Sequence, residues 1–277
     1  MRAASSLLAL VALAACDRPS VLVICHNSNC VEPTDPENDD TLDALNASLA
    51  IEVGGMPAID GTELDLFWRA SDDTCLFAHD LAGARTELAS EAATTIAAHL
   101  GKPGPITSHG APFNVFIELK PFVDPGEVVR HTPDQLARHA ACAWATYTTI
   151  SDAAVAAGRT IDVFFASFEP DLLRAMIAAR PANVPFEPRY EAFYGVPHPL
   201  DNATVPLDRY RGIPITLVEM HPQWIVDSQY EGLLSSRIDV GFFMFSATVE
   251  TFAAIEQYEP VVVNTSEASL LRRWLED

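Results

Sequence analysis

Ionisable residues recur where short apolar stretches of this chain end. In chain order they are His26, Glu63, Asp65, His79, Asp80, Glu118 and Lys120. Imidazole and carboxylate groups are the side chains that proton-transfer chemistry commonly uses. Glu63 and Asp65 are two residues apart, as are Glu118 and Lys120, so each pair shares one face if its segment is a strand. The elements that carry these residues decide whether they meet.

Apolar stretches alternate with helical patterns along the chain. The predicted strands cover residues 21–25, 61–67, 75–78, 114–119, 161–167, 215–220, 240–246 and 261–265, and the helical patterns cover 42–50, 87–100, 133–157 and 170–179. Such alternation predicts βαβ units and a parallel sheet. Eight strands and 277 residues fit a closed (β/α)8 TIM barrel. A ninth apolar run, 191–196, leaves the strand count open.

A barrel of this kind would bring the ionisable residues together. Its active site lies at the carboxyl ends of the strands, which form one rim. Ionisable groups at four successive strand ends would therefore converge on one pocket. Taken singly, each residue has a plainer reading, such as a solvated strand face for Glu63 and Asp65 or a structural histidine for His26.

The order of these motifs resembles the glycerophosphodiester phosphodiesterase family. The matching segments are His26-Asn27-Ser28, Pro36-Glu37-Asn38, Glu63-x-Asp65, His79-Asp80, Glu118-x-Lys120, Ala166-Ser167-Phe168 and Val263-Asn264-Thr265-Ser266. The resemblance extends over residues 21 to 275 or so. It implies a barrel of the phospholipase C-like phosphodiesterase type.

The resemblance also implies a role for each matching residue. Glu63, Asp65 and Glu118 would be ligands of a divalent metal ion, Ca²⁺ or Mg²⁺. His26 and His79 would be the general acid and base, in an order that the sequence leaves open. Lys120 would hold a phosphate oxygen. The residues expected to order the first loop or to lie near the substrate are Glu37, Asn38 and Trp224.

Two features depart from the family pattern. Asn27 and Ser28 stand where the family has Arg-Gly, and the arginine would contact phosphate. Only 39 residues lead from His79 to Glu118, which predicts a short or absent insertion subdomain. The short insertion and the His-x-x-Asn spacing of His26 and Asn29 resemble sphingomyelinase D-like toxins, and His26-Asn27-Ser28 is also similar to bacterial calcium-dependent phosphoinositide phospholipases C. All of these enzymes cleave phosphodiesters.

Three functions are therefore open. The first is cleavage of glycerophosphodiesters or lysophospholipid head groups, with histidine acid–base catalysis. The second is a phospholipase D-like or phosphoinositide phospholipase C-like activity on intact lipids. The third is a non-catalytic surface lipoprotein with a barrel fold.

The first residues of the chain predict export. Arg2 and a short apolar run lead to Leu13-Ala14-Ala15-Cys16, which resembles a bacterial lipobox. We therefore expect a signal peptide at 1–15, a lipidated Cys16 with a short linker to residue 20, and a phosphodiesterase domain at 21–277. The chain would be a periplasmic or cell-surface protein anchored in a membrane by lipid.

Composition limits the partners and leaves the cysteines undecided. The formal net charge is −21, which argues against a nucleic-acid partner. A small-molecule or lipid phosphodiester is the expected substrate, and the oligomeric state is open. In an oxidising compartment the four remaining cysteines allow three full pairings, and buried free thiols are equally compatible with the sequence. They are Cys25, Cys30, Cys75 and Cys142.

Overall fold

A computed structural model describes residues 20–79, 86–121, 131–195, 206–244 and 246–277. Eight parallel strands form a closed barrel, because β1 pairs with β11 on one side and with β4 on the other. The barrel strands are β1 (Leu22–Cys25), β4 (Gly61–Arg69), β6 (Phe113–Leu119), β7 (Ile161–Ala166), β8 (Arg189–Tyr194), β9 (Ile215–Met220), β10 (Asp239–Met244) and β11 (Val262–Thr265). The predicted TIM barrel is confirmed.

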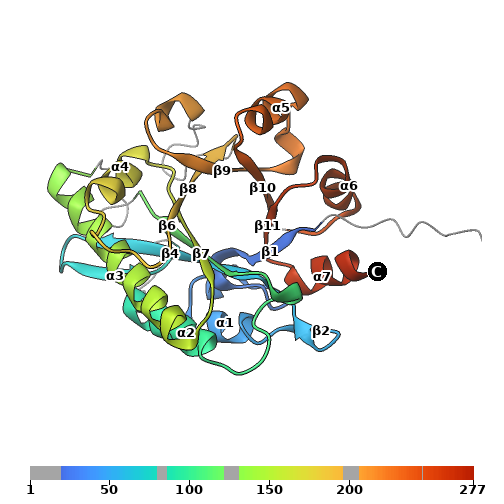
Figure 1. Ribbon diagram of the computed structural model, residues 1–277, viewed down its shortest axis with the longest axis horizontal. Helices are drawn as coiled ribbons and strands as arrows, with labels where there is room; N and C mark the ends of the chain where they lie inside the picture. The colour runs from blue at the N-terminus through green and yellow to red at the C-terminus, as the bar shows by residue number, and fades with distance from the viewer. Residues whose placement is uncertain (1–19, 80–85, 122–130, 196–205, 245) are drawn as a thin grey trace, which may run out of the picture.

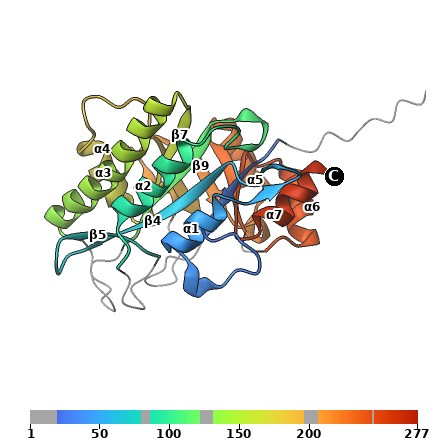
Figure 2. The ribbon, with the colours of Figure 1, turned by 90° about the horizontal axis from the view of Figure 1, so that it is seen from below.

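The α-helices of the described ranges lie outside the barrel wall (Figures 1 and 2). They are α1 (Leu42–Ser48), α2 (Ala89–Leu100), α3 (Pro133–Ala157), α4 (Pro170–Ala178), α5 (Asp227–Ser235), α6 (Val249–Tyr258) and α7 (Ala268–Glu276). Short 3₁₀ helices are η1 (His26–Ser28), η2 (Pro36–Asn38), η3 (Ser108–Gly110), η4 (Leu207–Tyr210) and η5 (Pro222–Trp224), and β2 (Glu52–Val53) pairs with β3 (Met56–Pro57) in a separate small sheet. Between β5 (Thr74–Phe77) and β6, the described residues hold only α2 and η3, as the predicted short insertion requires.

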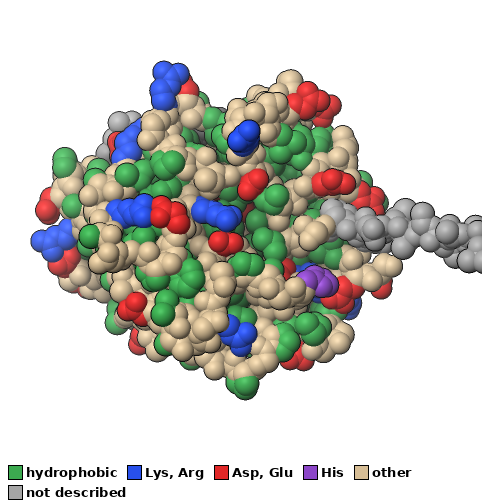
Figure 3. Space-filling model, in the orientation of Figure 1, with side chains coloured by type: hydrophobic (Ala, Val, Ile, Leu, Met, Phe, Trp, Pro, Cys, Tyr) green, Lys and Arg blue, Asp and Glu red, His purple; other side chains and the backbone are tan. Residues whose placement is uncertain are grey.

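None of the helices in the described part of the chain is both long and apolar enough to cross a bilayer. The predicted signal peptide and Cys16 lie outside the described residues, so they stay predictions. Figure 3 shows basic side chains lying next to acidic ones over one face of the molecule, rather than a field of one sign.

One predicted barrel strand was wrong. The apolar run at 75–78 is β5, which pairs antiparallel with β4 outside the barrel, with Arg69 opposite Thr74. A parallel neighbour needs a crossover of a dozen or more residues, and the few residues that separate these two runs allow only a hairpin. The strand that takes its place in the barrel is β8, between β7 and β9, which contains most of the run left open at 191–196.

The inside of the barrel changes from apolar to polar along its strands. Ile24, Phe116, Phe164, Leu217 and Val262 form an apolar cluster of their own. The residues two positions further along these strands, on the same face, are His26, Glu118, Ala166, Glu219 and Asn264. The amino-terminal half of the barrel is thus a packed core, and the carboxyl-terminal half is lined by polar groups.

The four cysteines of the described residues form two disulfides, which decides among the pairings that the sequence left open. Cys25 joins Cys30, and Cys75 joins Cys142. The first closes a loop around η1, which carries His26. The second ties the β4–β5 hairpin to α3.

A buried ion pair connects the barrel to the last helix. Arg272 of α7 contacts Asp60, which directly precedes β4, and both are almost fully buried. Arg272 Nε donates to the carbonyl of Ala58 at 3.1 Å. Asp60 also accepts from the backbone N–H groups of Val23 at 3.0 Å and Ser108 at 2.9 Å. Asp60 therefore gathers β1, β4 and α7 at one point.

We predict that Arg272→Met lowers the free energy of unfolding by about 3–5 kcal/mol, because it leaves the Asp60 carboxylate buried without its charge partner. Urea unfolding followed by circular dichroism measures this change. The exposed neighbour Arg273 is the matched control, and Arg273→Met is expected to change stability by less than about 0.5 kcal/mol. Equal stability of the two variants would contradict the assignment.

We also predict an acid-dependent loss of stability from His139. This residue is fully buried on α3, its Nε2 lies 3.0 Å from the carbonyl oxygen of Leu66, and burial and then His131 lower its pKa from 6.5 to about 3. Between these values the unfolded chain binds the extra proton, so stability falls as the pH falls below 6.5. From pH ~6.5 to ~4.5 the unmodified chain should lose roughly 2–3 kcal/mol more than His139→Gln does. Parallel pH profiles of the two proteins would refute this.

Candidate functional site

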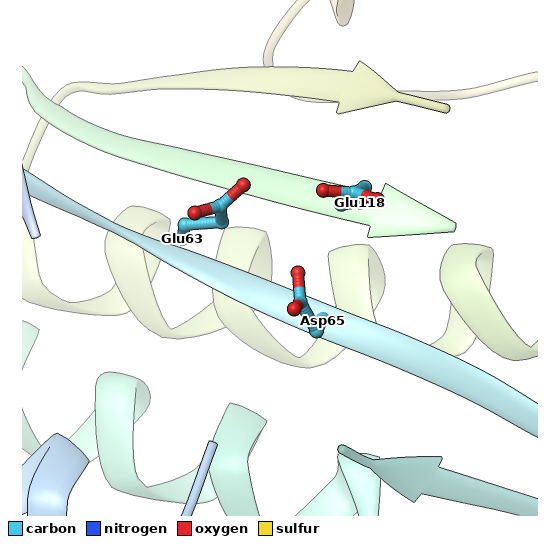
Figure 4. A group of neighbouring side chains, drawn as sticks. All are labelled: Glu63, Asp65 and Glu118. Carbon is cyan, nitrogen blue, oxygen red and sulfur yellow. The ribbon is translucent and has the colours of Figure 1, made fainter. Parts of the chain in front are cut away.

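Three carboxylates meet inside the polar half of the barrel. Glu63 and Asp65 lie on one face of β4, and Glu118 lies on the neighbouring strand β6, where it is opposite Asp65 (Figure 4). One oxygen from each lies within 4.8 Å of the others, and all three side chains are buried. The structure therefore brings together the three residues that the sequence nominated as metal ligands.

Lys120 lies directly beyond the end of β6 and contacts two of these carboxylates. Its Nζ is 2.8 Å from Asp65 Oδ2 and 2.9 Å from Glu118 Oε1. Burial alone would lower the pKa of Lys120, but the negative charges of Asp65 and Glu118 outweigh this and raise it well above its usual range. Lys120 therefore stays cationic and supplies positive charge beside the carboxylates.

Burial has the opposite effect on the carboxyl groups. It raises the pKa of Asp65 well above its usual range, and the nearby Asp40 carboxyl adds to this. Burial also raises the pKa of Glu118, against the influence of Lys120. A buried carboxylate that lacks enough positive neighbours favours either a proton or a cation.

His26 follows β1 and lies beside Glu63, one of the three carboxylates. Its Nε2 is 3.8 Å from Glu63 Oε2, and its Nδ1 is 3.4 Å from the Ser266 hydroxyl. The ring packs edge-on against Phe243 with centroids 4.6 Å apart. Burial, with a further contribution from Lys120, lowers the pKa of His26 from 6.5 to about 4. The imidazole is therefore neutral at neutral pH and able to accept a proton.

The backbone hydrogen bonding of β5 to β4 places His79 near the carboxylates. This histidine is half-buried and directly follows Ala78, whose N–H donates to the carbonyl oxygen of Asp65 at 3.0 Å. The antiparallel course of β5 thus returns His79 to the level of the carboxylates. Its partner in the motif, Asp80, lies outside the described residues.

Asn27 and Ser28 fill the place of the missing Arg-Gly with contacts to Glu63. Both adopt a positive φ, 48° for Asn27 and 54° for Ser28. The Asn27 N–H donates to Glu63 Oε2 at 3.1 Å, and the Ser28 hydroxyl donates to the backbone carbonyl of Glu63. The Asn27 side-chain nitrogen donates to Asp39, while its buried Oδ1 meets no donor among the described residues. Asn27 and Ser28 are thus tied to the β4 segment that carries Glu63.

The remaining nominated residues lie at the periphery. Glu37 and Asn38 are exposed on η2, in the loop after β1, and Asn38 helps to order this loop by accepting from the N–H of Thr41. Trp224 is 44% exposed on η5, packed against His221 with ring centroids 4.9 Å apart. None of these three residues belongs to the group of three carboxylates.

The sequence prediction missed several buried polar residues. Asp40 accepts from the N–H of Asp65 at 3.4 Å, and burial raises its pKa to about 8. Glu191 and Glu219 are almost fully buried on β8 and β9, and Asn264 on β11 donates to Glu63 Oε2 at 3.1 Å. The signal for both glutamates was present, since each is an acidic residue within an apolar strand, and buried carboxylates require partners.

The oxygen set fits a hard divalent cation. Carboxylate and amide oxygens are the ligands that Ca²⁺ and Mg²⁺ prefer. Asp65 Oδ1 and Asn27 Oδ1 are both buried, and neither has a hydrogen-bond donor among the described residues. Glu63, Asp65 and Glu118 would hold the ion.

Comparisons with known proteins agree at the level of the fold. The chain matches no protein-family model and no curated protein by sequence. It is similar in structure to a glycerophosphodiester phosphodiesterase from Parabacteroides distasonis, with a TM-score of 0.62 and 10% identity over 94% of this chain and 98% of that one.

Two further structures show the same similarity. One is an Oleispira antarctica phosphodiesterase in complex with its product sn-glycerol-3-phosphate, with a TM-score of 0.59 and 13% identity over 92% of this chain and 97% of that one. The other is a glycerophosphodiester phosphodiesterase from Agrobacterium tumefaciens, with a TM-score of 0.54 and 16% identity over 91% of this chain and 99% of that one. This chain therefore has the barrel fold of the glycerophosphodiester phosphodiesterases.

Proposed function

We propose that this chain is a divalent-metal-dependent phosphodiesterase that cleaves glycerophosphodiesters or lysophospholipid head groups. This proposal rests on the group formed by Glu63, Asp65 and Glu118, which have one oxygen each within 4.8 Å of the others inside the barrel. The similar Oleispira antarctica enzyme, whose product is sn-glycerol-3-phosphate, supports a small phosphodiester as the substrate.

The charges of the site suit a phosphodiester. A bound Ca²⁺ or Mg²⁺ would polarise a phosphoryl oxygen and offset developing negative charge. Lys120 Nζ, which lies 2.8 Å from Asp65, would hold a second non-bridging oxygen as a point charge. These groups orient the phosphorus for attack and disfavour a neutral ester.

The two histidines divide the proton transfers. His26 is neutral at neutral pH, since its pKa is lowered to about 4, and it would take the proton from the attacking hydroxyl. The attacking oxygen bonds to phosphorus as the bond to the leaving oxygen breaks. His79 would give a proton to that leaving oxygen. The attacking hydroxyl belongs to water in hydrolysis, or to the substrate in transfer to a cyclic phosphate.

The predicted lipid anchor at Cys16 would hold the enzyme at a membrane surface, where lysophospholipids and glycerophosphodiesters arise. This placement stays a proposal that rests on the N-terminal sequence. Globomycin sensitivity of processing, or mass spectrometry of the mature N-terminus, would test it directly.

A catalytically inactive barrel is less well supported. The absence of Arg-Gly after His26 favours it, but Asn27 and Ser28, which stand in that place, both contact Glu63. Their place beside the carboxylates supports a changed site rather than a lost one. Cleavage of intact lipids is separated by its products, since phospholipase C chemistry releases diacylglycerol and phospholipase D chemistry releases phosphatidic acid.

We predict that chelation abolishes activity on a glycerophosphodiester panel and that Ca²⁺ or Mg²⁺ restores it. Glu118→Gln should lower kcat/KM by roughly 100-fold or more at subsaturating metal, because it removes one charged ligand. The exposed Glu231→Gln on α5 is the control and should retain full activity. Full activity after chelation would end the metal-dependent assignment.

We predict that His26→Ala and His79→Ala each lower kcat by roughly 10²–10⁴-fold while the chain still binds the metal. Phosphorus NMR of the products measures both the rate and the reaction type, because a cyclic phosphate and a phosphomonoester give separate signals. His109→Ala, at an exposed position on η3, is the control. Near-normal turnover by the His79 variant would refute the proposed acid–base pair.

A further inference from the structure

The end of β11 lies beside two parts of the proposed site. β11 pairs with β1, and its Asn264 is opposite Ile24, two residues before His26. Asn264 and Ser266 are themselves two residues apart at this edge. Asn264 reaches Glu63 on β4, and Ser266 reaches His26.

Asn264 fixes one oxygen of Glu63. Its Nδ2 donates to Glu63 Oε2 at 3.1 Å, and the Asn27 N–H donates to the same oxygen at 3.1 Å. Both Asn264 and Glu63 are buried, so water does not readily replace these donors. With Oε2 held by two N–H groups, Oε1 is the oxygen left to bind a cation.

Ser266 contacts the Nδ1 side of the His26 ring. Its hydroxyl is 3.4 Å from His26 Nδ1, while His26 Nε2 is the nitrogen that faces Glu63. If Nδ1–H donates to this hydroxyl, the lone pair of the neutral ring lies on Nε2. The loop that follows is ordered, because the Glu267 N–H donates to Thr265 Oγ1 at 3.1 Å.

The backbone pairing of β1 with β4 is short. The pairing of β1 with β4 spans only two register positions, Ile24 with Gly61 and Cys25 with Thr62. Glu63 and His26 lie just beyond it, where the β1–β4 ladder no longer holds them in register. At this point Asn264 on β11 reaches past β1 and donates to Glu63 on β4. This side-chain hydrogen bond links the strands where the backbone pairing of β1 with β4 has ended.

We propose that the end of β11 positions the site: Asn264 sets which oxygen of Glu63 faces the cation, and Ser266 sets the tautomer of His26. This inference rests on the proposed function. Neither residue needs to touch the substrate or the reacting atoms. They are positioning residues with separate targets, so their substitutions should have separate signatures.

The Asn264 arm is tested by calorimetric titration of the chelated full chain with MgCl₂ and with CaCl₂. Asn264→Leu removes the donor and excludes a replacement water, and it should weaken cation binding roughly 10–100-fold. Saturating cation should bring kcat back to within about twofold of the unmodified chain. Where the Leu variant fails to fold by circular dichroism, Asn264→Ala carries the test.

Asn114→Ala is the matched control for a buried asparagine. Asn114 lies on β6 at the other end of the barrel and donates to the carbonyl oxygens of Pro112 and Asp60. Its loss should leave cation affinity unchanged. If the unmodified chain binds no cation, the proposed function fails. If it binds and Asn264→Leu binds equally well, only the positioning inference fails.

The Ser266 arm has the opposite signature. Ser266→Ala should lower kcat roughly tenfold with KM and cation affinity unchanged, and Ser266→Thr should restore kcat because it keeps the hydroxyl. A change in cation affinity, an unchanged kcat, or a failure of Thr to rescue would overturn the role assigned to Ser266.

Discussion

The cost of burying carboxyl groups is the constraint on which this structure depends. Among the described residues, six are buried in or beside the polar half of the barrel: Asp40, Glu63, Asp65, Glu118, Glu191 and Glu219. Isolated buried carboxylates are strongly disfavoured, so they need protons, hydrogen-bond donors or cations. Lys120 meets only two of them directly. A divalent cation among Glu63, Asp65 and Glu118 would supply much of the missing positive charge.

The rest of the fold keeps these groups in place. The apolar cluster that includes Phe116 and Phe164 fills the barrel below them, with the two rings stacked 4.5 Å apart. At the rim, the Cys25–Cys30 disulfide closes the loop that carries His26. A rigid floor and a covalently closed loop together limit how far the polar groups can move apart, which is what a preorganised site requires.

The sequence was most informative where chemistry and strand ends coincide. Glu63, Asp65 and Glu118 could be grouped because residues at the carboxyl ends of barrel strands converge. The direction of β5 was mistaken because the prediction counted apolar runs and did not weigh the short connection after β4, which allows only a hairpin. Asn27 was counted as the loss of an arginine, since its contact with Glu63 depends on a positive φ and on barrel closure. Asn264 reaches Glu63 only because the barrel closes, which no local pattern records.

The most direct test is a crystal structure of the chain grown with Mn²⁺ as a probe and measured at the manganese absorption edge. The account predicts one strong anomalous peak at roughly 2.0–2.6 Å from oxygens of Glu63, Asp65 and Glu118, with the Lys120 ammonium outside the coordination shell. A map without a peak among these three carboxylates, at a metal concentration that supports activity, would contradict it.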